Sequence, residues 1–111
     1  MKIAFATNGN SLKDEVVLHF GKAKNFLIFG TENGNFEVFE NPEIEGKGLP
    51  PDFFKSQNVD IVIVFSLGPR AFEKFKNYKI KVLKTTGGTI LENLKRFEEN
   101  KLKELSKEDI F

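Results

Sequence analysis

DIVIVFSLGP, residues 60–69, is the stretch that decides the fold of this chain. Residues 60–65 are apolar on both sides, which is typical of a central parallel strand with both of its faces covered. Ser66 and Gly68 belong to the loop that ends this strand, and Pro69 stands where a helix accepts proline, at its first position. A buried strand that passes through a glycine loop into a helix predicts an α/β domain.

Segments on both sides of this stretch extend the pattern. Residues 2–7 and 80–84 are short apolar runs, which predict two more strands, parallel to the first and joined to it by right-handed crossovers. The proline pair at 50–51 is accepted only in the first turn of a helix, and Thr89 followed by Glu92 is typical of a capping box. We therefore expect helices at 50–57, 69–77 and 89–100. The side chains expected to be largely buried are Phe5, Ile61, Ile63, Phe72, Val82, Ile90 and Leu94.

A hairpin completes the predicted sheet. Residues 25–30 and 35–40 are strand-like runs joined around Asn33-Gly34-Asn35, and Asn-Gly between such runs is the strongest short-range hairpin signal. The expected fold class is α/β, with a mixed five-stranded sheet ordered 3-2-1-4-5 and flanked by helices, similar to the ribonuclease H-like arrangement. No repeat or linker divides the sequence, so residues 1–111 are expected to form a single domain. The charged tail from Lys101 is expected to fray, apart from Leu102 and Leu105.

Composition narrows the classes of function. Lys and Arg together number 17 against 16 Asp and Glu, so no overall field draws the chain to nucleic acid or to a membrane. Lysines concentrate between residues 74 and 84, and we interpret Lys79 and Lys81 as guards of the outermost strand against aggregation. The chain has no cysteine, which excludes disulfides and thiolate-ligated metal sites. Without a signal peptide or a membrane-length apolar run we expect a cytoplasmic protein, and the abundant Lys and Glu favour a thermophile.

Two glycine loops follow predicted parallel strands, at the sheet edge where open α/β sheets place ligands. Ser66, Gly68 and Arg70 offer a hydroxyl, exposed backbone amides and a guanidinium at the start of one helix. Gly87 and Gly88 allow close backbone approach at the start of another. Helix N-termini bind anions through free N–H groups and the helix dipole. The alternative is that these residues only make the turns and cap the helices, and neither loop matches a nucleotide-binding motif.

The only histidine lies in a loop segment, residues 18–23, that reads LHFGKA. Because the chain lacks cysteine, His19 is the soft donor that could contact a metal-containing cofactor, which makes it the candidate metal ligand. A surface histidine without an assigned role is the alternative.

Known catalytic arrangements do not fit the sequence. A ribonuclease H-type nuclease needs carboxylates on the first strand and at neighbouring strand ends to hold two magnesium ions. Residues 2–7 and 61–70 contain no Asp or Glu. A serine triad lacks its G-x-S-x-G elbow, and phosphoryl transfer lacks its phosphate loop. We therefore expect a binding protein with a pocket and not an enzyme.

Residues 19–23, HFGKA, followed by Phe26, resemble the S-x-H-F-G-R-A-x-x-F signature of the dinitrogenase iron–molybdenum cofactor biosynthesis family. This NifX-like group includes the C-terminal domain of NifB-type proteins. The resemblance implies the ribonuclease H-like fold and a non-catalytic protein that carries iron–sulfur precursors of the nitrogenase cofactor, or the finished iron–molybdenum cluster, with cofactor-assembly proteins as partners. Further segments extend it over nearly the whole chain: Glu40-Asn41-Pro42, residues 59–62, Gly68-Pro69-x-Ala71-Phe72, residues 80–82, Gly87-Gly88-Thr89 and Leu102.

The resemblance also implies a site. His19, Phe20, Gly21 and Lys22 would contact the cofactor, in a pocket shared with the loops that contain Ser66, Gly68, Arg70, Gly87 and Gly88. Cofactor precursors of this kind are anionic, and backbone amides and cations suit them. The chain departs from the family pattern at Glu45, where H-G-x-G would place a second histidine. Two other classes of function stay open: a generic anion or small-ligand binding module with a regulatory role, and a protein-interaction domain that uses the His19 and hairpin surface.

Overall fold

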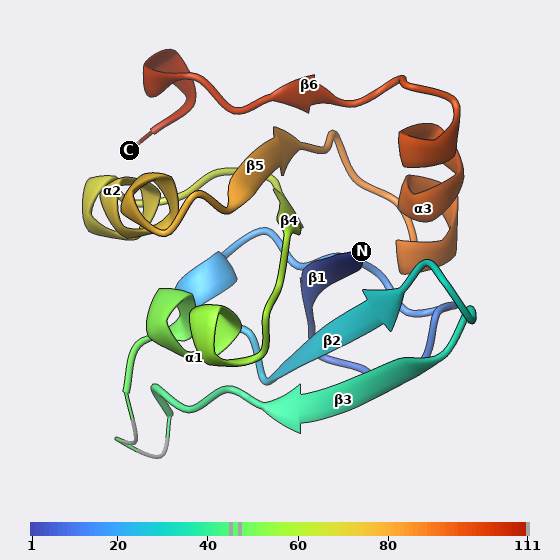
Figure 1. Ribbon diagram of the computed structural model, residues 1–111, viewed down its shortest axis with the longest axis horizontal. Coiled ribbons are helices and arrows are strands. Elements are labelled where there is room, and N and C mark those ends of the chain that lie inside the picture. The colour runs from blue at the N-terminus through green and yellow to red at the C-terminus, as the bar shows by residue number, and fades with distance from the viewer. Residues whose placement is uncertain (45, 47, 111) are drawn as a thin grey trace.

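One six-stranded sheet organises the computed structural model, which describes residues 1–44, 46 and 48–110 (Figure 1). Its strands are β1 (Lys2–Thr7), β2 (Asn25–Gly30), β3 (Phe36–Glu40), β4 (Ile61–Val64), β5 (Lys81–Lys84) and β6 (Lys103–Glu104). Its helices are α1 (Pro50–Ser56), α2 (Pro69–Asn77) and α3 (Ile90–Glu98), with short 3-10 helices η1 (Phe20–Lys22) and η2 (Lys107–Asp109). The expected helices and strands are therefore present, with α1 and α3 shorter than predicted.

The strand order is β3-β2-β1-β4-β5-β6, which confirms the predicted order of the first five strands. β1, β4 and β5 run parallel, and Val62 at the centre lies opposite Ala4 on one side and Val82 on the other. β2 and β3 extend the sheet as an antiparallel hairpin. The carboxyl ends of the three parallel strands consequently meet at one edge of the sheet, which is where the glycine loops begin.

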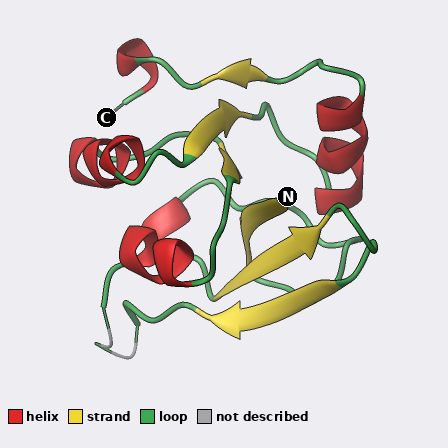
Figure 2. Cartoon of the chain, in the orientation of Figure 1, coloured by secondary structure: helices red, strands yellow, loops and turns green. Residues whose placement is uncertain are grey.

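The helices divide between the two faces of the sheet, α1 and α2 on one face and α3 on the other (Figure 2). This division follows from the alternation of side chains along the strands, because consecutive residues point to opposite faces. Ala4 and Val62 pack with α1 and α2, whereas Ile3 and Ile61 pack with α3. The apolar runs read from the sequence are thus buried on both sides.

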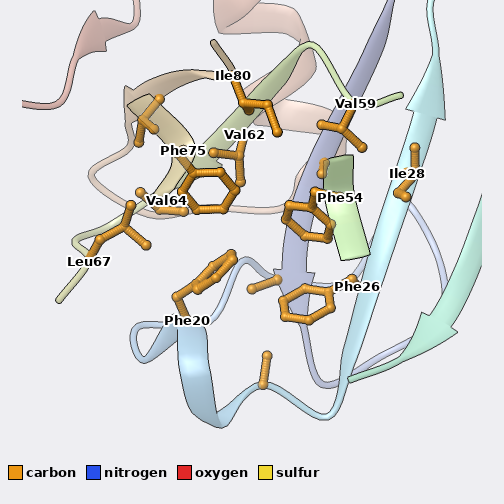
Figure 3. Close-up of a cluster of buried hydrophobic side chains, with 14 of the residues drawn as sticks. Phe20, Phe26, Ile28, Phe54, Val59, Val62, Val64, Leu67, Phe75 and Ile80 are labelled. Carbon is orange, nitrogen blue, oxygen red and sulfur yellow. The ribbon is translucent and has the colours of Figure 1, made fainter. Parts of the chain in front are cut away.

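Phenylalanine rings fill the core beneath α1 and α2 (Figure 3). Phe20 of η1 lies 5.2 Å from Phe26, 5.9 Å from Phe54 and 5.8 Å from Phe75, measured between ring centroids. Three of these rings are fully buried and Phe20 is 6% exposed. The pairs of Phe20 with Phe54 and with Phe75 are edge-to-face, and such packing adds to the burial of apolar area. It ties the short η1 helix, and with it the histidine loop, to the body of the protein.

The C-terminal tail corrects two predictions. We expected five strands and a frayed tail, but β6 pairs antiparallel with β5 and makes a sixth strand. Leu105 is buried and its N–H donates to the Val82 carbonyl at 3.0 Å, while Lys84 and Asp109 form an ion pair at 2.6 Å. β5 is therefore not the outermost strand. Lys81 lies 3.5 Å from Glu104 of β6 instead of guarding an edge.

Two side chains predicted as core are only partly buried. Phe72 and Leu94 pack against the two core clusters from their margins, whereas the other five predicted core residues are buried. Phe72 lies on α2 and Leu94 on α3. A helix that covers one face of the sheet alone, or that lies near the edge of the sheet, leaves part of its apolar stripe partly exposed to solvent. Among the described residues, no helix has the length and apolar character needed to cross a membrane.

Candidate functional site

A cavity of about 430 Å³ opens between the histidine loop and the starts of α1 and α2. Its walls come from three segments that are distant in sequence, residues 18–22, 49–51 and 66–74, and from Glu43. Seven of the nine predicted site residues line it: His19, Phe20, Gly21, Lys22, Ser66, Gly68 and Arg70. The cavity therefore joins two of the three loops that the sequence singled out.

His19 is presented to this cavity by its neighbour. The buried Phe20 ring anchors the loop, and the Lys22 N–H donates to the His19 carbonyl at 3.1 Å to close the η1 turn. The side chain of His19 is exposed, and its imidazole makes no hydrogen bond to any residue that the structure describes. An imidazole with both nitrogens available and a fixed backbone is a suitable metal or anion contact.

Asn41 holds the same loop, although nothing in the sequence indicated a role for it. Its side chain is completely buried, and its Nδ2 donates to the carbonyls of Gly21 at 3.2 Å and Ala23 at 2.9 Å. Its Oδ1 accepts the Glu43 N–H at 3.0 Å, which brings the Glu43 side chain to the cavity wall. These hydrogen bonds fix the position of the loop, because breaking them would leave buried polar groups without partners.

The start of α2 supplies unpaired N–H groups. Pro69 has no N–H, and the backbone amides of Arg70 and Ala71 have no acceptor among residues 1–44, 46 and 48–110. The first turn of a helix leaves such donors free unless a cap satisfies them, and Gly68 at the cap position has no side chain to do so. Both amides therefore lie at the positive end of the helix dipole, on residues that line the cavity.

The charges around the cavity are mostly positive. Within the described chain, Lys22 and Arg70 have no ion-pair partner. Lys74 lies against Asp52 at 2.9 Å, and hydrogen bonds from Tyr78 and then Lys74 hold the pKa of Asp52 below its usual value. Glu43 is the one carboxylate among the lining residues. Two free cations and two free amides against one carboxylate favour an anionic ligand.

Gly87 and Gly88 do not line this cavity, which differs from the pocket of three loops that we expected. The Gly87 carbonyl accepts hydrogen bonds from Asn93 at 3.1 Å and Arg96 at 2.6 Å, and the Gly88 carbonyl accepts one from Val16 at 3.1 Å. Both glycines have positive φ angles, +130° and +97°, which other residues rarely adopt. These contacts explain the two glycines as turn residues, and a role in binding stays a prediction.

The histidine loop also borders a second cavity. This space of about 680 Å³ lies at the carboxyl end of β1 and shares Leu18, His19 and Lys22 with the first cavity. Asp14 on its far wall accepts hydrogen bonds from the N–H groups of Asn10 and Ser11, which hold the pKa of that carboxyl below its usual value. Residues of the loop 18–22 thus line both cavities.

The donors at the cavity suit a preassembled anionic group better than a bare metal ion. No three His, Cys, Asp or Glu side chains in the described residues come together as a metal-ion cage. One imidazole is too few ligands for zinc, and one carboxylate too few for calcium. Amides, cations and a single imidazole can hold a group that already carries its own inorganic ligands.

Comparison with known proteins agrees on one family. Residues 1–100 match the family model described as dinitrogenase iron-molybdenum cofactor. An uncharacterized protein of Methanocaldococcus jannaschii is 35% identical over an alignment of 109 residues, and the match covers 92% of this chain and 89% of that protein. The NMR structure of a candidate NifB protein from Thermotoga, of the DUF35 family, superposes with a TM-score of 0.80 at 32% identity and covers 94% of this chain and 92% of its own. The apo orange protein of Desulfovibrio gigas shares the fold, with a TM-score of 0.84, 19% identity and 95% and 92% coverage.

Proposed function

Because this chain belongs to the dinitrogenase iron–molybdenum cofactor family, we propose that it binds an anionic iron–sulfur or iron–molybdenum cluster precursor and passes it on unchanged. The observation that carries the proposal is the shared cavity. The only imidazole of the chain lines the same space as Arg70 and Ala71 at the start of α2, whose guanidinium and backbone amides have no partner among the described residues. Family membership supplies the class of ligand, and the cavity supplies a place for it.

Each group has a separate part in this proposal. His19 Nδ1 or Nε2 would contact a metal atom at the surface of the cluster, since neutral imidazole is a common metal ligand. The N–H groups of Arg70 and Ala71 would donate to sulfide or to another anionic ligand of the cluster. Lys22 from the histidine loop and Arg70 from α2 would offset its charge. Gly21 and Gly68 leave room for the cluster, because no side chain stands at either position.

Carriage follows from the weakness of this attachment. A cluster held by one imidazole and by backbone donors can leave when a second protein offers stronger ligands, such as thiolates. A protein that catalysed a reaction on the cluster would need to hold it through the chemical step. We therefore propose cofactor-assembly proteins as the partners that deliver and receive the cargo.

Anaerobic loading tests the proposal. The purified chain is incubated with a synthetic iron–sulfur thiolate cluster, passed over a gel-filtration column, and analysed for iron and sulfide in the protein peak. We expect iron and sulfide to coelute with the wild-type chain, and retention to fall about tenfold or more in His19→Ala. Lys13→Ala, which changes an exposed side chain away from the cavity, is the matched control and should retain the cluster.

A small inorganic anion is the second candidate, because the free amides and cations do not themselves require a metal. In that case His19→Ala would bind the anion as well as wild type, while Arg70→Gln would bind it less. The cluster proposal would be contradicted if iron and sulfide eluted apart from the wild-type chain and if His19→Ala bound the anion as well as wild type.

A further inference from the structure

The third cation at the cavity, Lys74, is engaged by a neighbour. Its Nζ donates to both carboxylate oxygens of Asp52, at 3.0 and 2.9 Å. The same carboxylate accepts a hydrogen bond from the Tyr78 hydroxyl through its Oδ1. Lys74 lies in the last turn of α2, Tyr78 directly follows that helix, and Asp52 belongs to α1, so the three groups join the two helices beside the cavity.

Lys74 lies on the side of α2 that carries the binding groups. It follows Arg70 by four residues, so the two side chains stand one helical turn apart on one face. Both line the cavity, whereas Asp52 is not among its lining residues. The ammonium group therefore has two directions available to a flexible lysine side chain: toward Asp52, outside the cavity, or toward the Arg70 side, within it.

Asp52 can lose Lys74 without being left unpaired. Its Oδ1 keeps the Tyr78 hydroxyl as a donor, and 42% of its side chain is exposed to water. The hydrogen bond from Tyr78 is the first cause that holds the pKa of Asp52 below its usual value, so the carboxylate stays charged at neutral pH. Ion pairs with this degree of exposure are weak, and a competing anion can replace them.

We propose that Lys74 is a releasable third cation of the cavity, drawn from Asp52 by an anionic cargo while Tyr78 keeps Asp52 in place. This inference rests on the proposed function and adds the residues that set its affinity. Asp52 and Tyr78 are positioning residues, because both act through Lys74. Asp52 competes with the cargo for Lys74 and weakens binding, which suits a protein that must give its cargo up.

The proposal predicts opposite effects for the two positioning residues. Asp52→Asn frees Lys74, so binding of an anion should become about two- to fivefold tighter. Tyr78→Phe removes the second donor to Asp52 and leaves Lys74 to satisfy the carboxylate alone, so binding should become weaker. Residues that only supported the fold would shift the affinity in the same direction, toward weaker binding.

Isothermal titration with inorganic molybdate as the probe measures these effects. The variants are Asp52→Asn, Tyr78→Phe, Lys74→Ala and Asp52→Asn with Lys74→Ala. Glu73→Gln is the control, because it removes the same charge from an exposed position next to Lys74 on α2. Asp52→Asn should bind molybdate more tightly than the Glu73→Gln control does. This gain in affinity should vanish in the double variant Asp52→Asn with Lys74→Ala. Equal effects of Asp52→Asn and Glu73→Gln, a gain that survives Lys74→Ala, or no molybdate binding by either wild type or Asp52→Asn would overturn the proposal.

Tyr78 provides a second measurement that needs no ligand. It is the only tyrosine, and the chain has no tryptophan, so the phenolate absorbance reports on this residue alone. The hydrogen bond to Asp52 raises the pKa of Tyr78 above its usual value of 10.0, while Lys74 lowers it, and Lys55 stands 6.0 Å over the ring. Asp52→Asn should bring the titration of Tyr78 to lower pH, and an unchanged titration would overturn the proposal. Iron retention by wild type and His19→Ala tests the proposed function separately, because neither variant alters Asp52.

Discussion

The starts of α2 and α3 look alike in sequence and differ in what they leave free. Each follows a parallel strand and a glycine loop. At α3, the first-turn amides are all satisfied: Ile90 N–H donates to Asp14, Leu91 N–H to Leu12, and Glu92 N–H to the Thr89 hydroxyl. At α2, Arg70 and Ala71 have no acceptor in the described part of the chain.

The comparison teaches that a glycine loop before a helix indicates a turn, and that capping decides whether it is also a binding site. Residues 12–16 lie across the start of α3 and occupy its donors. No segment of the described chain does this at α2, where the cavity opens instead. One helix start therefore contributes to stability and the other is available for a ligand.

The largest expected effect is on the α3 side. Asn93 is completely buried, accepts a hydrogen bond from Thr85, and donates to the carbonyls of Gly87 and Thr89. Asn93→Ala leaves these buried groups unsatisfied, and we expect the free energy of unfolding to fall by about 2–3 kcal/mol. Ser66→Ala on the α2 side should change it by less than about 0.5 kcal/mol. Urea unfolding measures both changes in free energy. Similar losses for the two variants would mean that the loops before α2 and α3 contribute equally to stability.

Alanine at the glycines gives a matched pair. A Cβ at Gly88 would meet Glu92 Oε1 and Arg96 Nη1, both at 3.2 Å, at a φ of +97°. Gly88→Ala should cost about 1–3 kcal/mol of unfolding free energy because of this backbone strain. A Cβ at Gly68 would meet nothing within 4 Å, and its φ of −72° suits alanine. Thermal unfolding should show a loss below about 1 kcal/mol for Gly68→Ala, and a larger loss there would mean that Gly68 is required for the turn.

The two arginines separate binding from stability. Arg70→Gln should weaken retention of the iron–sulfur cluster about three- to tenfold with no change in the unfolding midpoint, because the guanidinium faces the cavity and has no partner in the described chain. Arg96→Gln should lower the unfolding midpoint without altering retention, because it removes the bond to the Gly87 carbonyl. Lys76→Gln, an exposed change on α2 outside the cavity, is the charge control. If Arg70→Gln lowered the unfolding midpoint and Arg96→Gln weakened retention, the loop before α3 and not the loop before α2 would be the binding site.

The smallest effect is the acid response of the α3 cap. Hydrogen bonds from the Thr89 backbone N–H hold the pKa of Glu92 below its usual value of 4.5. A lowered folded pKa gives stability that is fully present above pH 4.5 and is lost as the pH falls through the lower folded value. Wild type should therefore lose stability against Glu92→Gln as the pH drops below 4.5, since glutamine caps without titrating. Parallel stability curves for the two proteins in acid would show that Glu92 makes no such contact.

The sequence carried most of the fold because its strands are apolar on both faces and its turns use residues with few alternatives. The strand, loop and helix start at residues 60–69 and the hairpin turn at Asn33-Gly34 could be predicted from these residues with little information from the rest of the chain. β6 was missed because a two-residue strand of charged side chains, Lys103 and Glu104, has no pattern, and only the buried Leu105 after it reveals the attachment. The ribonuclease H-like classification stays a prediction.

The candidate site was predictable where a residue type is rare or where the neighbouring residues form a recognisable strand, loop and helix. His19 stood out as the single histidine, and Gly68 and Arg70 through the strand, loop and helix around them. Asn41 and Glu43 could not be assigned, because an asparagine after a strand is common and its burial depends on contacts with residues 20 positions away. The difference between the loops at Gly68 and Gly87 likewise depends on where residues 12–16 lie. Glu45, which replaces the family's second histidine, lies outside the described residues.

Backbone amide spectra test the central claim, that a cluster occupies the cavity at α2 and not the loop before α3. The ¹⁵N-labelled chain is loaded anaerobically with a paramagnetic iron–sulfur cluster, and its amide signals are compared with those of the cluster-free chain. We expect the signals of Arg70, Ala71 and residues 19–22 to broaden beyond detection, while Ile90 and Leu91 stay visible. Loss of the Ile90 and Leu91 signals, with those of Arg70 and Ala71 intact, would contradict the account.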